Sequence, residues 1–522
     1  QTHRLDSIAH TSLQHRYFVR ASMKVSAFPP LFLLLLIGLP GSSRLGTHAA
    51  EDHRHHELEE FMVVATSSLK HTARDAICSG HKVMPSGDGV RWVPMNRPHG
   101  PCSSSPAAME EDAVDDMLKW DQLRTSYIRR KLSGGGVGED LNSDTTTSGV
   151  SEKNGMGTTD VGLGNAKCAV PAPAAAPTHS LEEEAMTTVV PAARQTMVID
   201  TSSDITWVQC LPCPYPQCHT QKDPFYDPAN STTYAPIPCA SPACTRLGRS
   251  YGNGCSASKQ CRYVVNYGDG TATAGTYITD TLTLSPAIVV KRFQFGCSHA
   301  VKGSFSDQTA GVLALGGGAQ SLLAQTAKDY GNAFSYCVPL PSSLGFLSLG
   351  GPVGASSRFA RTPLIRNKRA PTFYIVRLEA ITVAGKRLAV PPAAFAAGAV
   401  MDSSAVVTQL PPQAYAALRA AFRTAMSAYG PLAPPVRNLD TCYDFTRFPN
   451  VKLPKVSLVF AGGAAKLDLD APSLMLDGCL AFAATPGGAD DSVGFIGNVQ
   501  QQTYEVLYDV GGGSVGFRRA AC

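Results

Sequence analysis

Two short apolar runs in this chain each end in an aspartate that is followed by hydroxyl residues. The first is MVIDTSSDITW at 197–207, which leads into Asp200, and the second is AVMDSSAVVTQLP at 399–411, which leads into Asp402. Apolar runs of this length, partly β-branched, predict buried strands that end in a turn. Two copies about one domain length apart predict an internal duplication that brings the two carboxylates together.

Short strands dominate the pattern from about residue 181 to residue 522. The segment 262–284 alternates on both sides of a Gly-Asp-Gly turn, which predicts a hairpin, and GVLALGGG at 311–318 predicts a buried strand that ends in glycines. Further strands are expected within 361–365, 372–390 and 494–519. One helix is predicted over Pro411–Tyr429, where Pro-Pro precedes AYAALRAAFRTAM. The pattern therefore predicts a mostly β segment in two halves, each with one Asp motif.

Upstream of residue 181 the pattern predicts one helix and a linker. From Ala108 to Leu132, apolar residues recur at helical spacing, with acids at 110–116 and the basic run 129–131 at the opposite end. The helix is either an ordinary packed helix or a pro-segment helix that masks a site. Residues 133–180 are rich in Gly, Ser, Thr, Ala and Pro, which predicts a flexible linker without a fold. The apolar positions of the helix are Met117, Trp120, Leu123, Tyr127 and Ile128.

The N-terminal segment has the pattern of a secretory signal. Met23-Lys24 is followed by an apolar run at 31–39 and by small residues before Glu51. A membrane anchor is the alternative, but the apolar run is too short to span a bilayer, and no later stretch is apolar enough. We therefore expect 1–22 to be a leader outside the native product and 23–50 to be the signal peptide.

Composition and charge exclude some classes of function. Charged residues make up only 16% of the 522 residues, with 47 Gly and 37 Pro, which favours strands and turns over long solvated helices. The net charge of +4 comes without a basic stripe that interleaves aromatic residues, so nucleic-acid binding is not expected.

Fifteen cysteines in a chain with a secretory signal predict disulfides. Twelve of them, an even number, follow the first Asp motif: Cys210, Cys213, Cys218, Cys239, Cys244, Cys255, Cys261, Cys297, Cys337, Cys442, Cys479 and Cys522. The sequon at Asn230 predicts a glycosylation site in a secreted chain.

The cysteines also allow other interpretations. Cys210-x-x-Cys213 with Cys218 and His219 has zinc-like spacing, and the same Cys-x-x-Cys could be a redox pair. A cysteine nucleophile could be built from Cys297 and His299. Disulfides are the usual state of cysteines in a secreted chain, so we expect no metal and no cofactor.

The segment 181–522 resembles the pepsin-like aspartic proteases, most closely the plant nepenthesin-type group. Asp200-Thr201 and Asp402-Ser403 match the catalytic Asp-Thr-Gly and Asp-Ser-Gly of that family, and NYGDGT around Tyr267 matches its flap. The cysteine-rich insert WVQCLPCPYPQC is similar to the insert of the nepenthesin-type group. Upstream, WVPMNRPHGPCS and MLKWDQLRTSYIRRKLSG resemble the pro-segments of that group.

This resemblance implies an all-β, bilobal fold with a few short helices, preceded by a signal peptide and a pro-segment. The pro-segment and linker would span 51–180, the N-terminal lobe 181–355 and the C-terminal lobe 356–522. The implied disulfides are Cys218–Cys297, Cys239–Cys261, Cys244–Cys255, Cys337–Cys522, Cys442–Cys479 and Cys210–Cys213.

The resemblance also implies the chemistry of the site. Two aspartates held close together share one proton, so one can take a proton from water while the other donates to a carbonyl oxygen. The catalytic residues would be Asp200 and Asp402, oriented by Thr201, Ser203 and Ser403. The substrate would be covered by the flap residues Tyr267, Gly268 and Asp269 together with Trp207.

The motifs depart from the family at three positions. Ser202 and Ser404 stand where the family has glycine, and Ala405 lacks the hydroxyl that Ser203 supplies in the first half. Because glycine allows backbone to approach closely, the two serines are expected to crowd the dyad, and a displacement of about 1 Å can cost on the order of a hundredfold in rate.

Two functional hypotheses follow from these motifs. The first is a secreted, acid-active aspartic endopeptidase that is made as a zymogen, acts on polypeptides as a monomer, and resides in the cell wall or vacuole. Its own pro-segment would inhibit it until acid protonates the carboxylates at 110–116. The second is a catalytically impaired protein of the same fold that binds peptides or proteins, as an inhibitor does.

Overall fold

The computed structural model describes residues 60–69, 91–96, 113–133, 158–163 and 193–519, the last range with gaps at 215, 249, 253, 304, 306–308, 341–342, 352–357 and 487–491. These residues belong to one compact unit, Arg54–Cys522. The expected leader and signal peptide lie outside the described residues, as do the acids at 110–112 and the expected lobe boundary at 355–356. Within the described part, no helix is long and apolar enough to cross a membrane.

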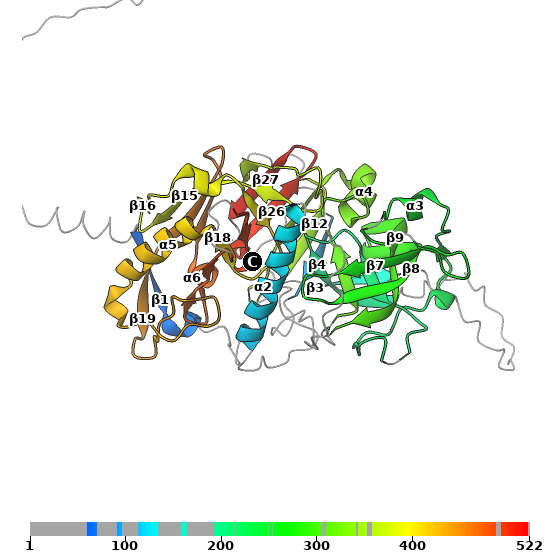
Figure 1. The fold of residues 1–522 in the computed structure, drawn as a ribbon, viewed down its shortest axis with the longest axis horizontal. Helices are drawn as coiled ribbons and strands as arrows, with labels where there is room; N and C mark the ends of the chain where they lie inside the picture. Colours follow the sequence, from blue (N-terminus) through cyan, green and yellow to red (C-terminus); the bar gives the residue numbers. More distant parts are fainter. Residues whose placement is uncertain are drawn as a thin grey trace, which may run out of the picture. The chain divides into compact units, whose positions relative to one another are not determined.

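The first half of the protein is built on an eight-stranded sheet. Its strands, in spatial order, are β3 (Thr158–Leu163), β4 (Ala193–Asp200), β10 (Gly311–Ala314), β5 (Trp207–Gln209), β9 (Ile288–Lys302), β8 (Ala272–Ser285) and β6 (Ala235–Pro236), with β7 (Arg262–Asn266) paired to β8. The antiparallel pair β7–β8 confirms the hairpin predicted at 262–284, and β9 continues it as the long antiparallel partner of β8 (Figure 1).

Three smaller sheets are built entirely from strands of the second half. The five-stranded sheet has the order β14 (Ile375–Val376), β17 (Ala399–Met401), β25 (Gly494–Ile496), β18 (Thr408–Leu410) and β24 (Phe482–Ala484). The four-stranded sheet has the order β16 (Lys386–Arg387), β15 (Leu378–Val383), β20 (Val456–Phe460) and β21 (Lys466–Leu469). The two-stranded pair is β22 (Met475–Leu476) with β23 (Cys479–Leu480).

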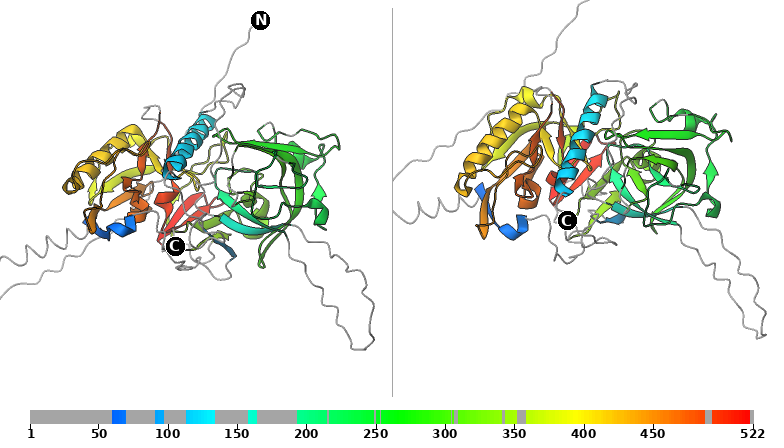
Figure 2. Two further views of the ribbon diagram at one scale, coloured as in Figure 1. Left: turned by 90° about the horizontal axis from the view of Figure 1, so that it is seen from below. Right: turned by 60° about the horizontal axis from the view of Figure 1, so that its bottom comes forward.

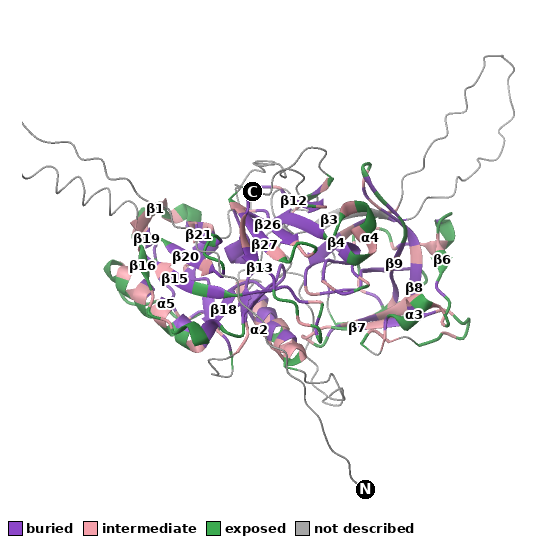
Figure 3. Ribbon diagram, turned by 90° about the horizontal axis from the view of Figure 1, so that it is seen from above, coloured by how far each residue is buried: buried purple, intermediate pink, exposed green. Residues whose placement is uncertain are grey.

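A six-stranded sheet joins the two halves. Its order is β13 (Ala360–Pro363), β27 (Ser514–Arg519), β26 (Tyr504–Asp509), β11 (Ala333–Cys337), β12 (Gly345–Leu349) and β2 (Trp92–Met95). Aromatic side chains of its own strands stack on one face, with the cross-strand partners Phe334 of β11 and Tyr508 of β26 4.6 Å apart between ring centroids. The strand interiors are buried throughout this region (Figure 3). The halves therefore share a core, as a bilobal all-β fold requires.

The internal duplication predicted from the Asp motifs is confirmed by strand order. In the first half, β4 pairs in parallel with β10, β10 in antiparallel with β5, and β5 in parallel with β9. In the second half, β17, β25, β18 and β24 repeat the same order with the same strand directions. Each half therefore contains an equivalent four-strand unit, and the aspartate lies at the end of the first strand of that unit.

Helices are few and mostly short. The α-helices are α2 (Ala113–Leu132), α3 (Pro242–Thr245), α4 (Leu322–Tyr330), α5 (Pro412–Ala425), α6 (Ala471–Leu474) and α7 (Asn498–Gln501). The 3-10 turns are η1 (Thr66–Leu69), η3 (Pro228–Asn230), η5 (Pro392–Phe395) and η6 (Ser427–Tyr429). Both long helices expected from periodicity are present, α5 with η6 over 412–429 and α2 over 113–132. Two views show α2 lying between the strands of the first half and those of the second (Figures 1 and 2).

The prediction that 133–180 has no fold was wrong for Thr158–Leu163. These residues form β3, which pairs with β4 over its whole length and with β8 at Gly162 and Leu163. A strand added to an existing sheet needs few apolar side chains of its own, because its backbone hydrogen bonds and one buried residue, here Leu163, hold it in place. Two further strands come from 51–180: β2, and β1 (Phe61–Ala65), which pairs with β19 (Asn450–Pro454).

Four of the six implied disulfide pairings were wrong. The structure pairs Cys210 with Cys297, Cys213 with Cys218, Cys239 with Cys255, and Cys244 with Cys261. It confirms Cys442–Cys479. Cys337 is also disulfide-bonded, whereas its expected partner Cys522 lies outside the described residues.

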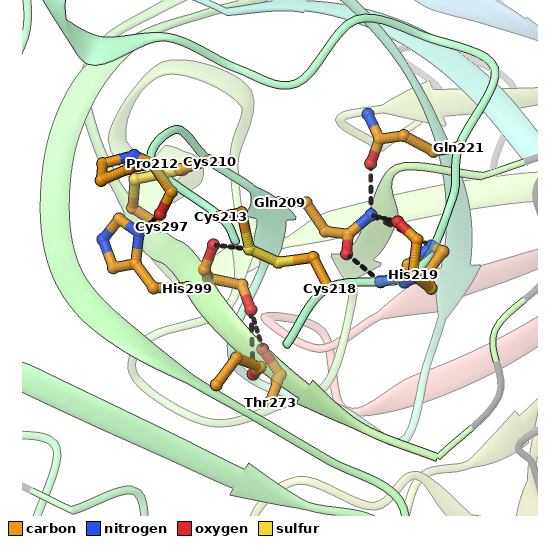
Figure 4. Close-up of a disulfide and its surroundings, with 12 residues drawn as sticks. Gln209, Cys210, Pro212, Cys213, Cys218, His219, Gln221, Thr273, Cys297 and His299 are labelled. Atoms are coloured by element: carbon orange, nitrogen blue, oxygen red, sulfur yellow. Dashed lines mark hydrogen bonds between the residues drawn. A yellow bond between two sulfur atoms is a disulfide. The ribbon is translucent and has the colours of Figure 1, made fainter. Parts of the chain in front are cut away.

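Strand register explains the first of these corrections. The parallel pairing of β5 with β9 places Val208 opposite Cys297, and the N–H of Cys210 donates to the Ser298 carbonyl at 2.9 Å. The Cα atoms of Cys210 and Cys297 are consequently 5.3 Å apart, within the usual disulfide range (Figure 4). Cys218 is left to pair with Cys213, at 5.9 Å between Cα atoms.

The disulfides exclude two hypotheses for these cysteines, a zinc site in the cysteine-rich insert and a nucleophile at Cys297. All three cysteines of the zinc-like pattern are bonded to sulfur, and Cys297 is no free thiol beside His299, whose Nδ1 lies 3.2 Å from the Pro212 carbonyl (Figure 4). Among the described residues, no group of three or more His, Cys, Asp or Glu side chains could hold a metal ion. Asn230 is exposed at the end of η3, so its glycosylation stays a prediction.

Candidate active site

Asp200 and Asp402 lie together where the two halves meet. Asp200 is the last residue of β4 and Asp402 directly follows β17, and both are buried, with 4% and 0% of their surface exposed. The glycine turn after β10 closes the first loop, because the N–H of Gly316 donates to the Ser203 carbonyl at 2.8 Å. A Cβ at Gly316 would lie 2.5 Å from that oxygen, so only glycine fits the approach.

The two Asp turns are tied to each other by the hydroxyl residues that follow the aspartates. The N–H of Thr201 donates to the Ser403 hydroxyl at 3.1 Å, and the N–H of Ser403 donates to the Thr201 hydroxyl at 3.0 Å. These reciprocal bonds cross between the halves and are buried. Thr201 and Ser403 therefore join the two Asp turns directly, one from each half.

Each carboxylate also accepts hydrogen bonds from its own turn. Asp200 Oδ1 accepts from the N–H of Ser202 at 2.9 Å, and its Oδ2 accepts from the Ser203 hydroxyl at 2.5 Å. Asp402 Oδ1 accepts from the N–H groups of Ser404 and Ala405 at 2.8 and 3.1 Å. Ser202, predicted to crowd the site, instead donates its hydroxyl to Asp402 Oδ2 at 3.1 Å.

The flap residues surround the same site. The indole Nε1 of Trp207 donates to the Tyr267 hydroxyl at 2.6 Å, which joins the flap to the strand after the first Asp motif. Asp269 accepts from the N–H of Thr271 at 2.9 Å and so closes the turn of the hairpin. A Cβ on Gly268 would lie 2.1 Å from Cβ of Tyr127 in α2, so the flap backbone packs directly on that helix.

Arg124 of α2 binds both aspartates at once. Its Nη2 lies 2.6 Å from Asp200 Oδ1 and 2.9 Å from Asp402 Oδ1, and its Nε donates to Asp402 Oδ2 at 3.0 Å. Burial by itself would raise the pKa of Asp200, but the Arg124 charge and hydrogen bonds from Arg124 and Ser203 hold that pKa below its ordinary value. One guanidinium thus lies between the two carboxylates and binds both.

A second charged residue of α2 is buried beside the dyad. Asp121 is fully buried, and its carboxylate accepts from the N–H of Val406 at 2.7 Å and from Gln409 Nε2 at 3.2 Å. Burial raises the pKa of Asp121 to about 7, and the neighbouring charge of Asp402 adds to that rise. The helix is therefore held by two polar contacts to the second Asp loop as well as by Arg124.

Further contacts fasten α2 at other points along its length. The Tyr127 hydroxyl donates to the Asn266 carbonyl of the flap at 2.9 Å, and near the start of the helix Asp115 pairs with Arg437 at 2.6 Å. Asp115 is the one member of the acidic run 110–116 for which an ion pair with the body is seen among the described residues. The helix touches the flap and the second half together.

Helical spacing could have indicated Arg124 and Asp121. Met117, Asp121, Arg124 and Ile128 follow each other at intervals of four, three and four residues, so they share one face of the helix. The end members are buried apolar residues, and charged residues between them on a buried face need partners. Only the apolar members of the helix pattern were singled out from the sequence, so these two were missed.

Comparisons with known proteins agree with the two-part fold. Two family models match the chain, described as "Xylanase inhibitor N-terminal" over residues 186–351 and "Xylanase inhibitor C-terminal" over residues 373–519. The crystal structure of basic 7S globulin from soybean is similar with a TM-score of 0.51 at 18% identity, over 71% of this chain and 93% of that chain, which concerns the fold alone.

Named relatives decide the family. The aspartyl protease AED1 of Arabidopsis thaliana is 36% identical over 438 residues, which are 81% of this chain and 85% of the relative. The chain belongs to the plant pepsin-like aspartic proteases. The aspartic proteinase nepenthesin-1 of Nepenthes gracilis is 32% identical to this protease over 354 residues, which are 64% of this chain and 76% of nepenthesin-1. The protein is thus an aspartic-type peptidase, and its substrates are polypeptides.

Proposed function

We propose that this protease is made as a zymogen, is active in acid, and hydrolyses peptide bonds with Asp200 and Asp402 once α2 has left the dyad. The observation that carries the proposal is the single guanidinium of Arg124 bound to both carboxylates. A dyad in this state has no free oxygen pair to hold a water, so the enzyme is latent while α2 stays in place.

The released dyad would work with one shared proton. The ionised carboxylate takes a proton from water as the water oxygen attacks the substrate carbonyl carbon, and the protonated carboxyl donates to the carbonyl oxygen. Collapse of the tetrahedral intermediate breaks the C–N bond: the carboxyl that took the water proton gives it to the leaving nitrogen, while the other carboxylate takes a proton from a gem-diol hydroxyl as the new carbonyl forms, which restores the singly protonated dyad. Thr201 and Ser403 hold the carboxylates at a fixed separation, and Tyr267, held by Trp207, covers the site.

Acid would release α2 through the dyad itself. Binding of α2 lowers the pKa of Asp200, so the stabilisation from the Arg124 contact is fully present above the ordinary aspartate pKa and is lost as the pH falls through the lowered value. The secretory segment and the disulfides support an extracellular or vacuolar destination, where such acid conditions occur.

Asp121 has the opposite pH dependence, which gives a testable prediction. Binding of α2 raises the pKa of Asp121 to about 7, so this contact stabilises the bound helix most when Asp121 is protonated and weakens as the pH rises through about 7. Asp121→Asn is expected to make α2 more resistant than in the wild type to an added protease at pH 8, and the difference is expected to narrow as the pH falls toward the ordinary aspartate pKa, below which Asp121 is protonated in both states. Equal cleavage rates of the two proteins at pH 8 would show that Asp121 does not titrate on release.

The proposed activity is tested by digestion of a denatured protein with purified material that lacks residues 51–133. We expect new peptide termini to accumulate below about pH 5 without added metal or thiol. Absence of cleavage at every acidic pH would contradict the proposal and would favour the peptide-binding alternative.

A further inference from the structure

We propose that Ser202 is a positioning residue of the dyad, which donates its hydroxyl across the two halves to Asp402 and replaces the hydrogen bond that Ala405 cannot give. The proposal rests on hydrolysis by the Asp200–Asp402 dyad. It reverses the expectation that a serine at this position impairs the site.

The internal duplication identifies the missing bond. Three residues after Asp200 stands Ser203, whose hydroxyl donates to Asp200 Oδ2 at 2.5 Å. Three residues after Asp402 stands Ala405, which offers only its N–H, and this binds the other carboxylate oxygen, Oδ1, at 3.1 Å. Asp402 Oδ2 therefore has no hydroxyl donor from its own turn.

Ser202 fills that position from the other half. Its hydroxyl lies 3.1 Å from Asp402 Oδ2, while its N–H holds Asp200 Oδ1 at 2.9 Å. One residue thus contacts both carboxylates, with its backbone on one and its side chain on the other. In consequence the oxygens Asp200 Oδ2 and Asp402 Oδ2 each accept one hydrogen bond from a serine hydroxyl.

The equivalent serine of the second half shows that this role is specific to Ser202. Ser404 stands two residues after Asp402, as Ser202 stands two residues after Asp200, and its hydroxyl oxygen is buried without a hydrogen-bond partner. The N–H of Ser404 still donates to Asp402 Oδ1 at 2.8 Å. The two glycine-to-serine departures are thus unequal, since only one of the two hydroxyls contacts the dyad.

A hydroxyl that donates to an ionised carboxylate favours the ionised form. Loss of the Ser202 hydroxyl would therefore leave the dyad protonated to a higher pH and would loosen the orientation of Asp402. Both effects change kcat rather than KM, since the hydrogen bond acts on the reacting carboxylate and not on substrate binding. Neither effect is expected from a residue that only fills space.

The experiment compares Ser202→Gly, Ala405→Thr and the double variant in the protein freed of its pro-segment. Ser202→Gly is expected to lower kcat by roughly tenfold with little change in KM and to move both limbs of the pH–rate profile to higher pH. Addition of Ala405→Thr is expected to restore most of kcat and both limbs, because a local hydroxyl again reaches Asp402. Ser427→Gly, a glycine substitution at an exposed serine of η6, is the control and is expected to move neither limb.

Two results would overturn the role of Ser202: a kcat that rises in Ser202→Gly, or a double variant no better than Ser202→Gly alone. If the wild type cleaves nothing, the proposed function fails but the role of Ser202 can still be tested in the full chain. There, Ser202→Gly is expected to make α2 susceptible to an added protease at a higher pH than in the wild type, because the dyad that holds Arg124 protonates earlier. An unchanged release pH would then contradict the proposal.

Discussion

Replacement of Asp402 with Asn in the pro-segment-free protease is expected to lower kcat by about three orders of magnitude or more. The dyad shares one proton, and an amide can neither take a proton from water nor release one to the substrate. The neighbouring N–H groups of Ser404 and Ala405 can still bind the amide oxygen, so the fold around residue 402 is expected to persist. Steady-state hydrolysis of a peptide at acid pH measures the effect.

Asp468→Asn is the control for the Asp402 substitution. Asp468 is a half-exposed residue of β21 that pairs with Lys466 at 2.7 Å, so its replacement removes one carboxylate from the same half without touching the dyad. Its kcat is expected to stay within about twofold of the wild-type value. Asp402→Asn with activity close to that of Asp468→Asn would rule out the dyad as the source of hydrolysis.

Replacement of Arg124 with Met is expected to abolish latency in the full chain. Without the guanidinium, α2 would bury two carboxylates that have no cation between them, and removal of one partner of a buried ion pair typically costs about 3–5 kcal/mol. The population of the open form would rise by roughly a hundredfold or more. The full-length variant should therefore cleave peptides at about pH 4.5, where α2 of the wild type still covers the dyad, as measured by initial rates before any processing of the chain.

Arg130→Met separates this effect from a general loss of charge on the helix. Arg130 is an exposed residue of α2, and its replacement removes the same charge from the same helix. Latency is expected to be unchanged in this variant. If Arg124→Met remained as latent as Arg130→Met, the inhibition of the dyad would have to come from elsewhere in residues 51–180.

The two halves and the dyad could be predicted because their signals are local. Apolar runs into Asp200 and Asp402, the turn at Tyr267 and the Pro-started helix α5 each depend on a few adjacent residues, and the structure has all of them. The duplication then requires that the two motifs meet, since each half has the same strand order. The reciprocal hydrogen bonds between Thr201 and Ser403 form because the two motifs lie next to each other.

Contacts between distant segments were the part that the sequence did not determine. Strand register decides which cysteines are neighbours, and nothing in the spacing of Cys210 and Cys218 distinguishes the partner of Cys297. In the same way, β3 depends on the free edges of β4 and β8 rather than on its own composition. The contact of Arg124 with the two aspartates depends on where α2 lies in the fold. The periodicity of the helix does not determine that position.

Ser202 illustrates why a departure from a motif is hard to interpret before the surrounding side chains are placed. Its added side chain would crowd a dyad in which every other hydroxyl was already present. Here Ala405 leaves one carboxylate oxygen without its hydroxyl donor, and Ser202 lies 3.1 Å from that oxygen. The two departures have to be considered together, because they act on the same atom from opposite halves.

The pH–rate profile of the pro-segment-free protein, measured beside Asp200→Asn, tests the central claim most directly. We expect hydrolysis in the wild type to rise and fall with pH in the acid range, as a pair of carboxyl groups with one shared proton requires, and to vanish in Asp200→Asn. A maximum above pH 7, or an acid activity that survives in Asp200→Asn, would contradict hydrolysis by the Asp200–Asp402 dyad.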